Sequence, residues 1–239
     1  MSRVLPILFN TDMVRAILDG RKTVTRRLVK PQPQYDVQCP LGYCTDGYKS
    51  EIGKFAFGSH ENGGKMIFCK PPYHTDDILY VRETWEHFDC CSCEGDEHGN
   101  CPKEPQKSVL DKYGFGCYMY RASDEIWGDA KWHPSIHMPK EAARIWLKVK
   151  DVRVERLKDM TDKDALKEGA QGVKCDHAGL GAYGCTDCMN TGWLEPPILE
   201  FMGIWDSTIK KSDLDRYGWN ANPWVWVIEF ERCEKPENW

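Results

Sequence analysis

Residues 17–27 read ILDGRKTVTRR, a stretch that combines a helix end, an extended segment and a cluster of cations. Gly20 is expected to end the helix, because glycine adopts the left-handed conformation after a helical run without steric cost. The β-branched residues Thr23, Val24 and Thr25 favour an extended strand after it. Alternation divides this strand into two faces, with Thr23, Thr25 and Arg27 on one and Lys22, Val24 and Arg26 on the other. The stretch is therefore either a solvated edge strand or a surface that holds an anionic or polar group.

The segments around this stretch predict short strands and few helices. Apolar and β-branched runs indicate strands at 4–9, 66–70, 76–85, 118–122, 143–157 and 224–230. Helices are expected at 12–20, 160–169 and 198–211, and Thr161 and Gly169 fit the cap and the terminator of the second. This mixture indicates an α+β protein with a small β-barrel or curled sheet flanked by helices.

Length and charge narrow the classes of protein. The chain has 239 residues, of which 41% are hydrophobic, enough to bury a large core. The net charge of −5 gives no overall basic field, so long duplex DNA is not an expected partner. Cations gather locally at 21–30 and 140–158, where a small or single-stranded anionic ligand fits. No apolar run approaches the roughly 20 residues that span a bilayer and no secretory signal is evident, so we expect a cytoplasmic protein without a membrane partner.

Three stretches rich in glycine, proline or cysteine interrupt the regular pattern. They lie at about 31–65, 87–117 and 172–195, and we interpret them as loop insertions. The chain has 12 cysteines, most of them in these stretches. In a reducing compartment, this number favours metal sites over disulfides. The cysteines beside strand-like runs are expected to be small core residues instead: Cys69, Cys117 and Cys233.

The sharpest metal-binding pattern is formed by Cys175, His177, Cys185 and Cys188. It reads C-x-H followed by C-x-x-C, and three glycines lie between the two halves. Four soft ligands in two short pairs suit tetrahedral Zn²⁺, and the glycines let the backbone turn tightly around the ion. The alternative is a loop with free cysteines.

A second pattern, C-x2-C-x4-H-x2-C, is formed by Cys90, Cys93, His98 and Cys101. It is similar to the CCHC zinc knuckle of nucleic-acid-binding proteins, although its last spacer is two residues shorter. The neighbouring Cys91 can replace Cys90. The sequence therefore predicts one structural zinc and allows a second. Four protein ligands leave no open coordination position, so either ion would fasten a loop and perform no chemistry.

Three motifs together resemble the ASCH domain, a PUA-like β-barrel family. ILDGRKTVTRR resembles the family's G-x-K-T-x-x-x-R-like turn after the first helix, and DDILYVRETW (76–85) resembles its G-D-x-L-x-V strand. MTDKDALKEG (160–169) resembles its later helix, in which an alanine and a terminal E-G pair recur. RETW, KWHPSIHMP and NPWVWVIEF look like the longer ASCH-type proteins of phages and prophages. The resemblance covers roughly 4–30, 66–87, 118–170 and 198–232, and it implies a single ASCH-like domain over 1–239 with the three insertions outside the minimal domain.

The resemblance also implies an activity. One small bacterial member family is an N(4)-acetylcytidine amidohydrolase, and its catalytic lysine, threonine and glutamate match Lys22, Thr25 and Glu168. In that family the threonine is the proposed nucleophile, the lysine is its activator and the glutamate handles protons. A threonine hydroxyl is a weak nucleophile, so it needs such an adjacent base. This implies an amidohydrolase that acts on a modified pyrimidine nucleoside.

The remaining site residues concern ligand binding. Arg27 and Arg82 suit a phosphate or a tetrahedral oxyanion, and Trp85 and Arg144 complete the predicted substrate-binding set. An alternative keeps the same cleft without catalysis, as a phage-derived module for single-stranded RNA or a modified nucleobase. Trp85, Trp132 and Trp224 would then stack on bases. A third reading is a phage accessory protein that binds a host protein through its insertions.

Overall fold

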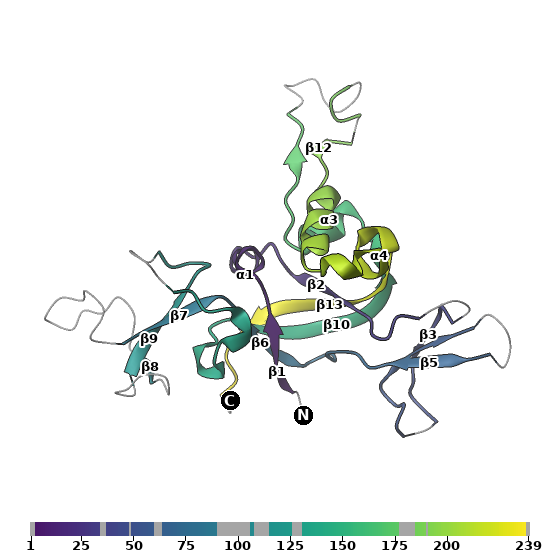
Figure 1. Ribbon diagram of the computed structural model, residues 1–239, viewed down its shortest axis with the longest axis horizontal. Helices are drawn as coiled ribbons and strands as arrows, with labels where there is room; N and C mark the ends of the chain where they lie inside the picture. The colour runs from purple at the N-terminus through teal and green to yellow at the C-terminus, as the bar shows by residue number, and fades with distance from the viewer. Residues whose placement is uncertain are drawn as a thin grey trace, which may run out of the picture. The chain divides into compact units, whose positions relative to one another are not determined.

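The computed structural model describes residues 3–33, 37–47, 49–59, 64–89, 106–107, 115–125, 131–176, 185–189 and 191–237. The chain divides into two compact units. The first consists of Met1–Gly20, Asp77–Lys148 and Arg232–Trp239, and the second of Arg21–Asp76 and Val149–Glu231. Short strands outnumber helices in the described residues, so the predicted α+β class is confirmed (Figure 1). No described helix has the length and apolar character needed to cross a membrane.

The first unit begins with a strand, a helix and a return to the same sheet. Its elements are β1 (Val4–Leu8), α1 (Thr11–Leu18), β6 (Ile78–Arg82), β7 (Trp85–Asp89), β8 (Gln106–Lys107), β9 (Phe115–Tyr120), the 3-10 turns η2 (Ser135–His137) and η3 (Lys140–Ala142), and the start of β10 (Trp146–Arg156). β1 runs parallel to β6, and β6 runs antiparallel to β10. β7, β9 and β8 form a separate antiparallel sheet.

Helix α1 ends where the sequence predicts. The Met13 N–H donates to Asn10 Oδ1 at 2.8 Å, so Asn10 caps the start of the helix. Gly20 follows its C-cap with φ of +74°, a conformation that glycine adopts without strain. The residues after Gly20 therefore leave the helix in an extended conformation.

The second unit contains the cationic stretch and most of the remaining elements. These are β2 (Val24–Leu28), β3 (Cys39–Tyr43), β4 (Phe55–Gly58), β5 (Met66–Cys69), the rest of β10, η4 (Leu157–Asp159), α2 (Asp162–Lys167), β11 (Val173–Lys174), β12 (Trp193–Glu195), α3 (Pro197–Ser207), η5 (Lys211–Asp213), α4 (Leu214–Tyr217), η6 (Trp219–Ala221) and nearly all of β13 (Trp224–Cys233). Its strands follow the order β10-β13-β2, with β13 antiparallel to β2. β3, β4 and β5 form a second antiparallel sheet, and β11 pairs with β12.

The described strands form no closed barrel, which differs from the predicted small β-barrel. A barrel gives every strand two hydrogen-bonded neighbours. β1 has only β6 as a neighbour in the first unit, and β2 has only β13 in the second. The sheets of the described residues are therefore open.

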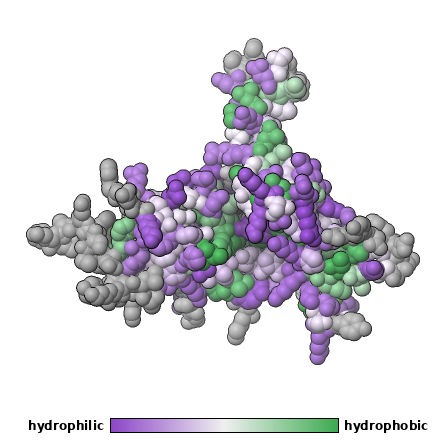
Figure 2. All heavy atoms as spheres, in the orientation of Figure 1, coloured by the Kyte–Doolittle hydropathy of each residue, from purple (hydrophilic) through white to green (hydrophobic). Residues whose placement is uncertain are grey.

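The predicted insertion at 31–65 contains regular structure. β4 is buried along its whole length, and its aromatic rings pack on β3 and β13. The ring centroid of Phe55 lies 5.2 Å from that of Tyr43 and 6.0 Å from that of Trp226, and the centroid of Phe57 lies 5.2 Å from that of Trp224. The outer strands of this sheet, β3 and β5, are less buried than β4. Figure 2 shows hydrophobic atoms over β3 and β5, where Leu41 and Met66 are more than half exposed.

Two helices cover one face of β2 and β13. Val24 of β2 and Val225 and Val227 of β13 share a core with Phe201 and Trp205 of α3. α2 also contributes to this core, and its start is fixed by a capping box between Thr161 and Asp164, as predicted. Glu168 is the C-cap of α2, and the helix ends beside the residues before β2, where the Thr23 N–H donates to the Lys167 carbonyl.

The buried Tyr120 of the first unit makes the free energy of unfolding depend on pH in the alkaline range. It is 5% exposed and donates to the Ala142 carbonyl at 2.7 Å. Burial raises the pKa of Tyr120 well above its ordinary value of 10.0, although the charge of Arg144 opposes the shift. The unfolded chain therefore releases the phenolic proton near pH 10 while the folded protein keeps it, so the free energy of unfolding falls as the pH rises above that value. Urea unfolding between about pH 9 and 11.5 should show a shallower fall for Tyr120→Phe than for the wild type. Equal slopes would contradict this.

Candidate functional site

The end of α2 is tied to the segment before β2 by main-chain and side-chain hydrogen bonds. Thr23 N–H donates to the Lys167 carbonyl at 2.8 Å, and the Arg21 guanidinium donates to the Gly169 carbonyl at 2.8 Å. On its other side, the Thr23 carbonyl accepts from Phe230 N–H at 2.9 Å. Lys22 is thereby held against the carbonyl end of α2, where a cation is favoured.

Lys22 and Glu168 form a buried ion pair. The Lys22 ammonium lies 2.6 Å from Glu168 Oε2, and the two side chains are 0% and 4% exposed. The Lys22 ammonium also donates to the Glu168 carbonyl and to the Val24 carbonyl, each at 2.8 Å. An ammonium has three protons, so these acceptors engage all of them. Lys22 therefore fixes both the backbone and the carboxylate of Glu168.

Opposing effects act on the charge of Lys22. Burial lowers the pKa of Lys22 from its ordinary value, and the Glu168 carboxylate opposes this by attraction and by hydrogen bonding. The positive charges of Arg27 and Arg26 lower the Lys22 pKa further. Glu168 therefore favours the charged ammonium, whereas burial and the two guanidinium groups disfavour it.

Arg26 connects Glu168 to a second carboxylate. Its guanidinium lies 3.3 Å from Glu168 Oε1 and 3.4 Å from Glu155 Oε2. The Arg26 side chain is 1% exposed, whereas that of Glu155 is 27% exposed and also bonds Arg153. The sequence did not single out Arg26 or Glu155 as site residues. The signal for Arg26 was its alternation with Lys22, which places both cations toward Glu168.

Thr25 and Arg27 lie on the opposite face of β2. Arg27 Nη1 donates to Thr25 Oγ1 at 2.9 Å and to the Arg26 carbonyl at 3.1 Å. Thr25 is 1% exposed, and Arg27 is partly exposed. Burial lowers the pKa of Arg27, while the charges of Glu168 and Tyr73 raise it. Glu168 therefore contacts Lys22 directly and acts electrostatically on the arginine that binds Thr25.

The other predicted substrate-binding residues lie in the first unit. Arg144 forms a two-pronged pair with Glu83, with donor–acceptor distances of 2.9 and 3.0 Å, and its guanidinium lies 3.9 Å from the Tyr120 ring centroid. Arg82 donates to the Ile136 carbonyl at 3.2 Å. Trp85 is 4% exposed and packs with Tyr118. These contacts are internal to the first unit, and the roles of the three residues in ligand binding stay predictions.

The buried carboxylate Glu83 was missed by the sequence interpretation. Its side chain is 1% exposed and is neutralised by Arg144, 61 residues further along the chain. Such pairing between distant residues leaves no local sequence signal. Removing either partner of such a fully buried carboxylate–arginine pair strongly destabilises the folded protein.

The second unit also contains a cavity of about 570 Å³. Tyr43, His74 and Asp151 are among its lining residues, and the residues of the Lys22 ion pair are not. Burial, aided by the charge of Asp151, raises the pKa of Tyr43 to about 12, and the Tyr43 hydroxyl donates to the Val152 carbonyl. This cavity is distinct from the ion-pair network around Glu168.

Comparisons with protein-family models, with curated proteins and with solved structures gave no match for this chain. Its function is therefore inferred from the residues themselves.

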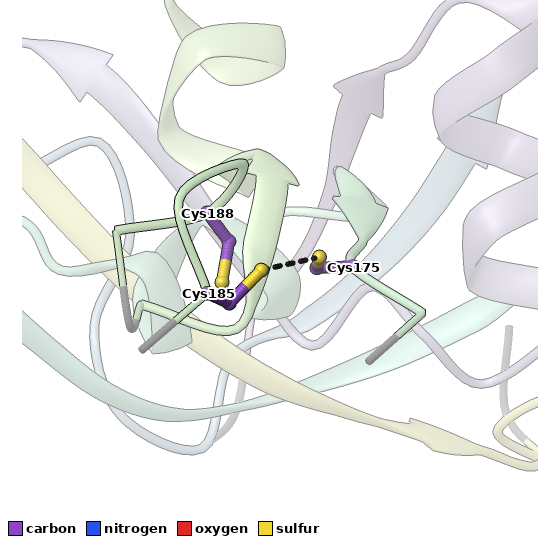
Figure 3. Close-up of side chains that lie close together, drawn as sticks. All are labelled: Cys175, Cys185 and Cys188. Carbon is purple, nitrogen blue, oxygen red and sulfur yellow. Dashed lines mark hydrogen bonds between the residues drawn. The ribbon is translucent and has the colours of Figure 1, made fainter. Parts of the chain in front are cut away.

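Three cysteines of the predicted metal site converge (Figure 3). The Sγ atoms of Cys175, Cys185 and Cys188 lie within 4.8 Å of one another, and those of Cys175 and Cys185 are 3.7 Å apart. Tetrahedral zinc with Zn–S bonds of about 2.3 Å separates its sulfurs by about 3.8 Å. The three thiols are therefore placed to hold a metal ion. The other predicted ligands lie outside the described residues: His177, Cys90, Cys93, His98 and Cys101.

Backbone contacts hold this cysteine cluster in shape. Cys175 N–H donates to the Gly192 carbonyl at 3.0 Å, and the Cys188 carbonyl accepts from the Thr191 N–H and hydroxyl at 2.9 and 2.6 Å. Burial and the thiols of Cys185 and Cys188 raise the pKa of Cys175 to about 12. A bound cation has the opposite effect, because it deprotonates a coordinating thiol.

Proposed function

We propose that this protein is an ASCH-like, PUA-related amidohydrolase that removes the acyl group from a modified pyrimidine nucleoside such as N(4)-acetylcytidine. The main support is the buried Lys22–Glu168 contact, because it joins two of the three residue types that the family resemblance requires. The third, Thr25, accepts a hydrogen bond from Arg27, and the charge of Glu168 opposes the lowering of the Arg27 pKa by burial. Arg27 is partly exposed, whereas Lys22, Thr25 and Glu168 are buried.

In the proposed reaction Thr25 is the nucleophile, and the family resemblance makes Lys22 its activator and Glu168 a further proton-handling group. Thr25 Oγ1 forms a bond to the acyl carbon, the bond from that carbon to N4 breaks, and the hydroxyl proton is transferred to N4. Cytidine leaves, and Thr25 holds the acyl group as an ester. Water then attacks the ester carbon, one water proton returns to Thr25 Oγ1, and the carboxylic acid leaves. Lys22 keeps the Glu168 carboxylate in place through both steps.

The deciding experiment compares a substitution at position 25 that removes the hydroxyl with one that keeps it. Thr25→Val removes the hydroxyl and should lower cytidine release from N(4)-acetylcytidine by about a hundredfold or more, whereas Thr25→Ser keeps a nucleophile and should retain measurable activity. Thr45→Val makes the same chemical change at an exposed threonine and should behave as the wild type. Thermal unfolding establishes that each variant is folded.

Two outcomes would count against this function. One is equal activity in the wild type and Thr25→Val, and the other is no hydrolysis of any acylated cytidine by the wild type. If an inactive wild type still binds the nucleoside or single-stranded RNA in a salt-dependent manner, and Thr25→Val does not weaken that binding, the protein is a non-catalytic binding module instead.

We further propose that the cysteine cluster binds structural Zn²⁺ in a reducing cytoplasm. Thiolates and imidazole are preferred zinc ligands, and His177 is the fourth ligand that the sequence predicts. The ion would fasten Cys175, after β11, to the turn that carries Cys185 and Cys188. This role concerns the stability of the segment, and no step of the proposed reaction involves the ion.

A further inference from the structure

The cavity of about 570 Å³ in the second unit has the size of a small-molecule site. Such sites usually measure about 300–1,000 Å³. Three parts of the chain line it, namely residues 43–45 with 52–53, residues 74–75 and residues 151–152. Among the lining residues, Ile52 is 51% exposed, so the cavity opens to solvent. A ligand can therefore enter it from solution.

Hydrogen bonds between these segments form the walls in advance. The Tyr43 hydroxyl donates to the Val152 carbonyl at 2.8 Å and joins the end of β3 to β10. The Asp76 N–H donates to the Val149 carbonyl at 2.9 Å and holds residues 74–75 beside the same strand. Walls that are already fixed lower the entropic cost of binding.

The lining groups decide which ligands fit. Ile52, Val152 and the ring of Tyr43 offer apolar surface, whereas His74 and Asp151 supply an imidazole and a carboxylate. Of the described residues that line the cavity, none is a lysine or an arginine. The cavity therefore disfavours phosphates and other anions, and it suits a molecule with an apolar body and a polar or cationic end.

The charge of Asp151 favours a cation over a neutral group. Arg153 Nη1 lies 3.3 Å from Asp151 Oδ2, but the same guanidinium also lies 2.6 Å from Glu155 Oε1 and 3.6 Å from Glu229 Oε2. One cation shared by three carboxylates neutralises Asp151 only in part. Burial raises the pKa of Tyr43 to about 12, and the charge of Asp151 contributes to this rise. The field that disfavours a phenolate here favours an ammonium group.

We propose that this cavity binds a small amine, with the ammonium group at Asp151 and the apolar body against Tyr43, Ile52 and Val152. The cavity contains none of the residues to which the proposed reaction is assigned, so this inference does not depend on that function. It gives a binding role to the stretch at 31–65, which the sequence alone indicated only as a loop insertion.

Phenethylamine tests the site against two molecules with the same ring and a similar length, neutral 2-phenylethanol and anionic 3-phenylpropionate. Each is titrated into nitrogen-15-labelled protein at neutral pH and followed at the backbone amides of Gly53 and Val152. Phenethylamine should bind with a dissociation constant below about 1 mM. The alcohol should bind at least about threefold more weakly, and the propionate at least about tenfold more weakly.

Two substitutions separate the charge from the shape of the cavity. Asp151→Asn keeps the shape and should weaken phenethylamine binding at least about threefold, whereas Asp215→Asn, at an exposed carboxylate of α4, should not. Ile52→Arg brings a cation to an exposed lining position and should abolish binding of the amine. Leu199→Arg makes a comparable change at an exposed leucine of α3 and should bind as the wild type does.

Three results would overturn the proposal. The first is that the alcohol or the propionate binds as tightly as the amine. The second is that Asp151→Asn or Ile52→Arg binds phenethylamine as well as the wild type does, which means that the amine is held elsewhere on the acidic surface. The third is that about 10 mM phenethylamine causes no saturable shift at the amides of Gly53 and Val152.

Discussion

Lys22→Met should lower the free energy of unfolding by about 3–5 kcal/mol, because it leaves the Glu168 carboxylate buried without its ammonium partner. Methionine fills a similar volume, so the loss is electrostatic and does not arise from a cavity. Arg26 remains 3.3 Å from Glu168 Oε1 and places the effect toward the lower end of this range. Urea unfolding at neutral pH, followed by circular dichroism, measures the change.

Two further variants test whether the loss of stability comes from the buried charge of Glu168. Lys150→Met removes an exposed ion pair with Glu231, whose side chains are 50% and 54% exposed, and should change stability by less than about 1 kcal/mol. Lys22→Met combined with Glu168→Gln removes both charges, so it should be more stable than Lys22→Met alone. If the free energy of unfolding of Lys22→Met lies within about 1 kcal/mol of that of the wild type, Lys22 and Glu168 are not a tightly coupled buried pair.

Cys185→Ser should remove most of the bound metal. We expect the wild type to carry about one zinc per chain, since the apparent binding free energy of structural zinc sites is about 10–16 kcal/mol at neutral pH. Serine replaces the sulfur that lies 3.7 Å from Cys175 Sγ with a much weaker ligand, so the metal content should fall to less than about one fifth. Elemental analysis of dialysed protein gives both values.

Proteolysis shows what the metal does for the chain. Without the ion, the segment between β11 and β12 should be cleaved faster, while the rest of the protein resists as before. Cys44→Ser changes a cysteine whose thiol donates to the Asp46 carbonyl, so it should keep both its metal content and its resistance. A wild type that carries no zinc after growth and refolding in zinc would contradict the proposed site.

The local features of the fold could be read from the sequence. Gly20 ends α1, Thr161 caps α2, and Cys175 approaches Cys185 and Cys188 because each of these depends on residues close in the chain. Alternation also correctly paired Thr25 with Arg27 on one face of β2. Short-range spacing carries this information.

Features that depend on contacts between residues far apart in the chain could not be predicted from the sequence in this way. β4 is a buried strand of four residues within a glycine-rich stretch, and its identity comes from packing on Trp224 and Trp226. The Arg26–Glu155 contact joins residues 129 positions apart. The predicted barrel failed in the described strands for a related reason, since closure depends on pairing between strands that no local pattern specifies.

The chain passes between its two compact units four times, at 20–21, 76–77, 148–149 and 231–232. Neither unit is thus a contiguous piece that a shortened gene could encode. A truncated chain that stops before residue 232 keeps the second unit entire but deprives the first of its final segment, and one that starts at residue 21 removes the first two elements of the first unit. Fragment expression is therefore a poor way to assign activity to either unit, and point substitutions in the intact chain are the better tool.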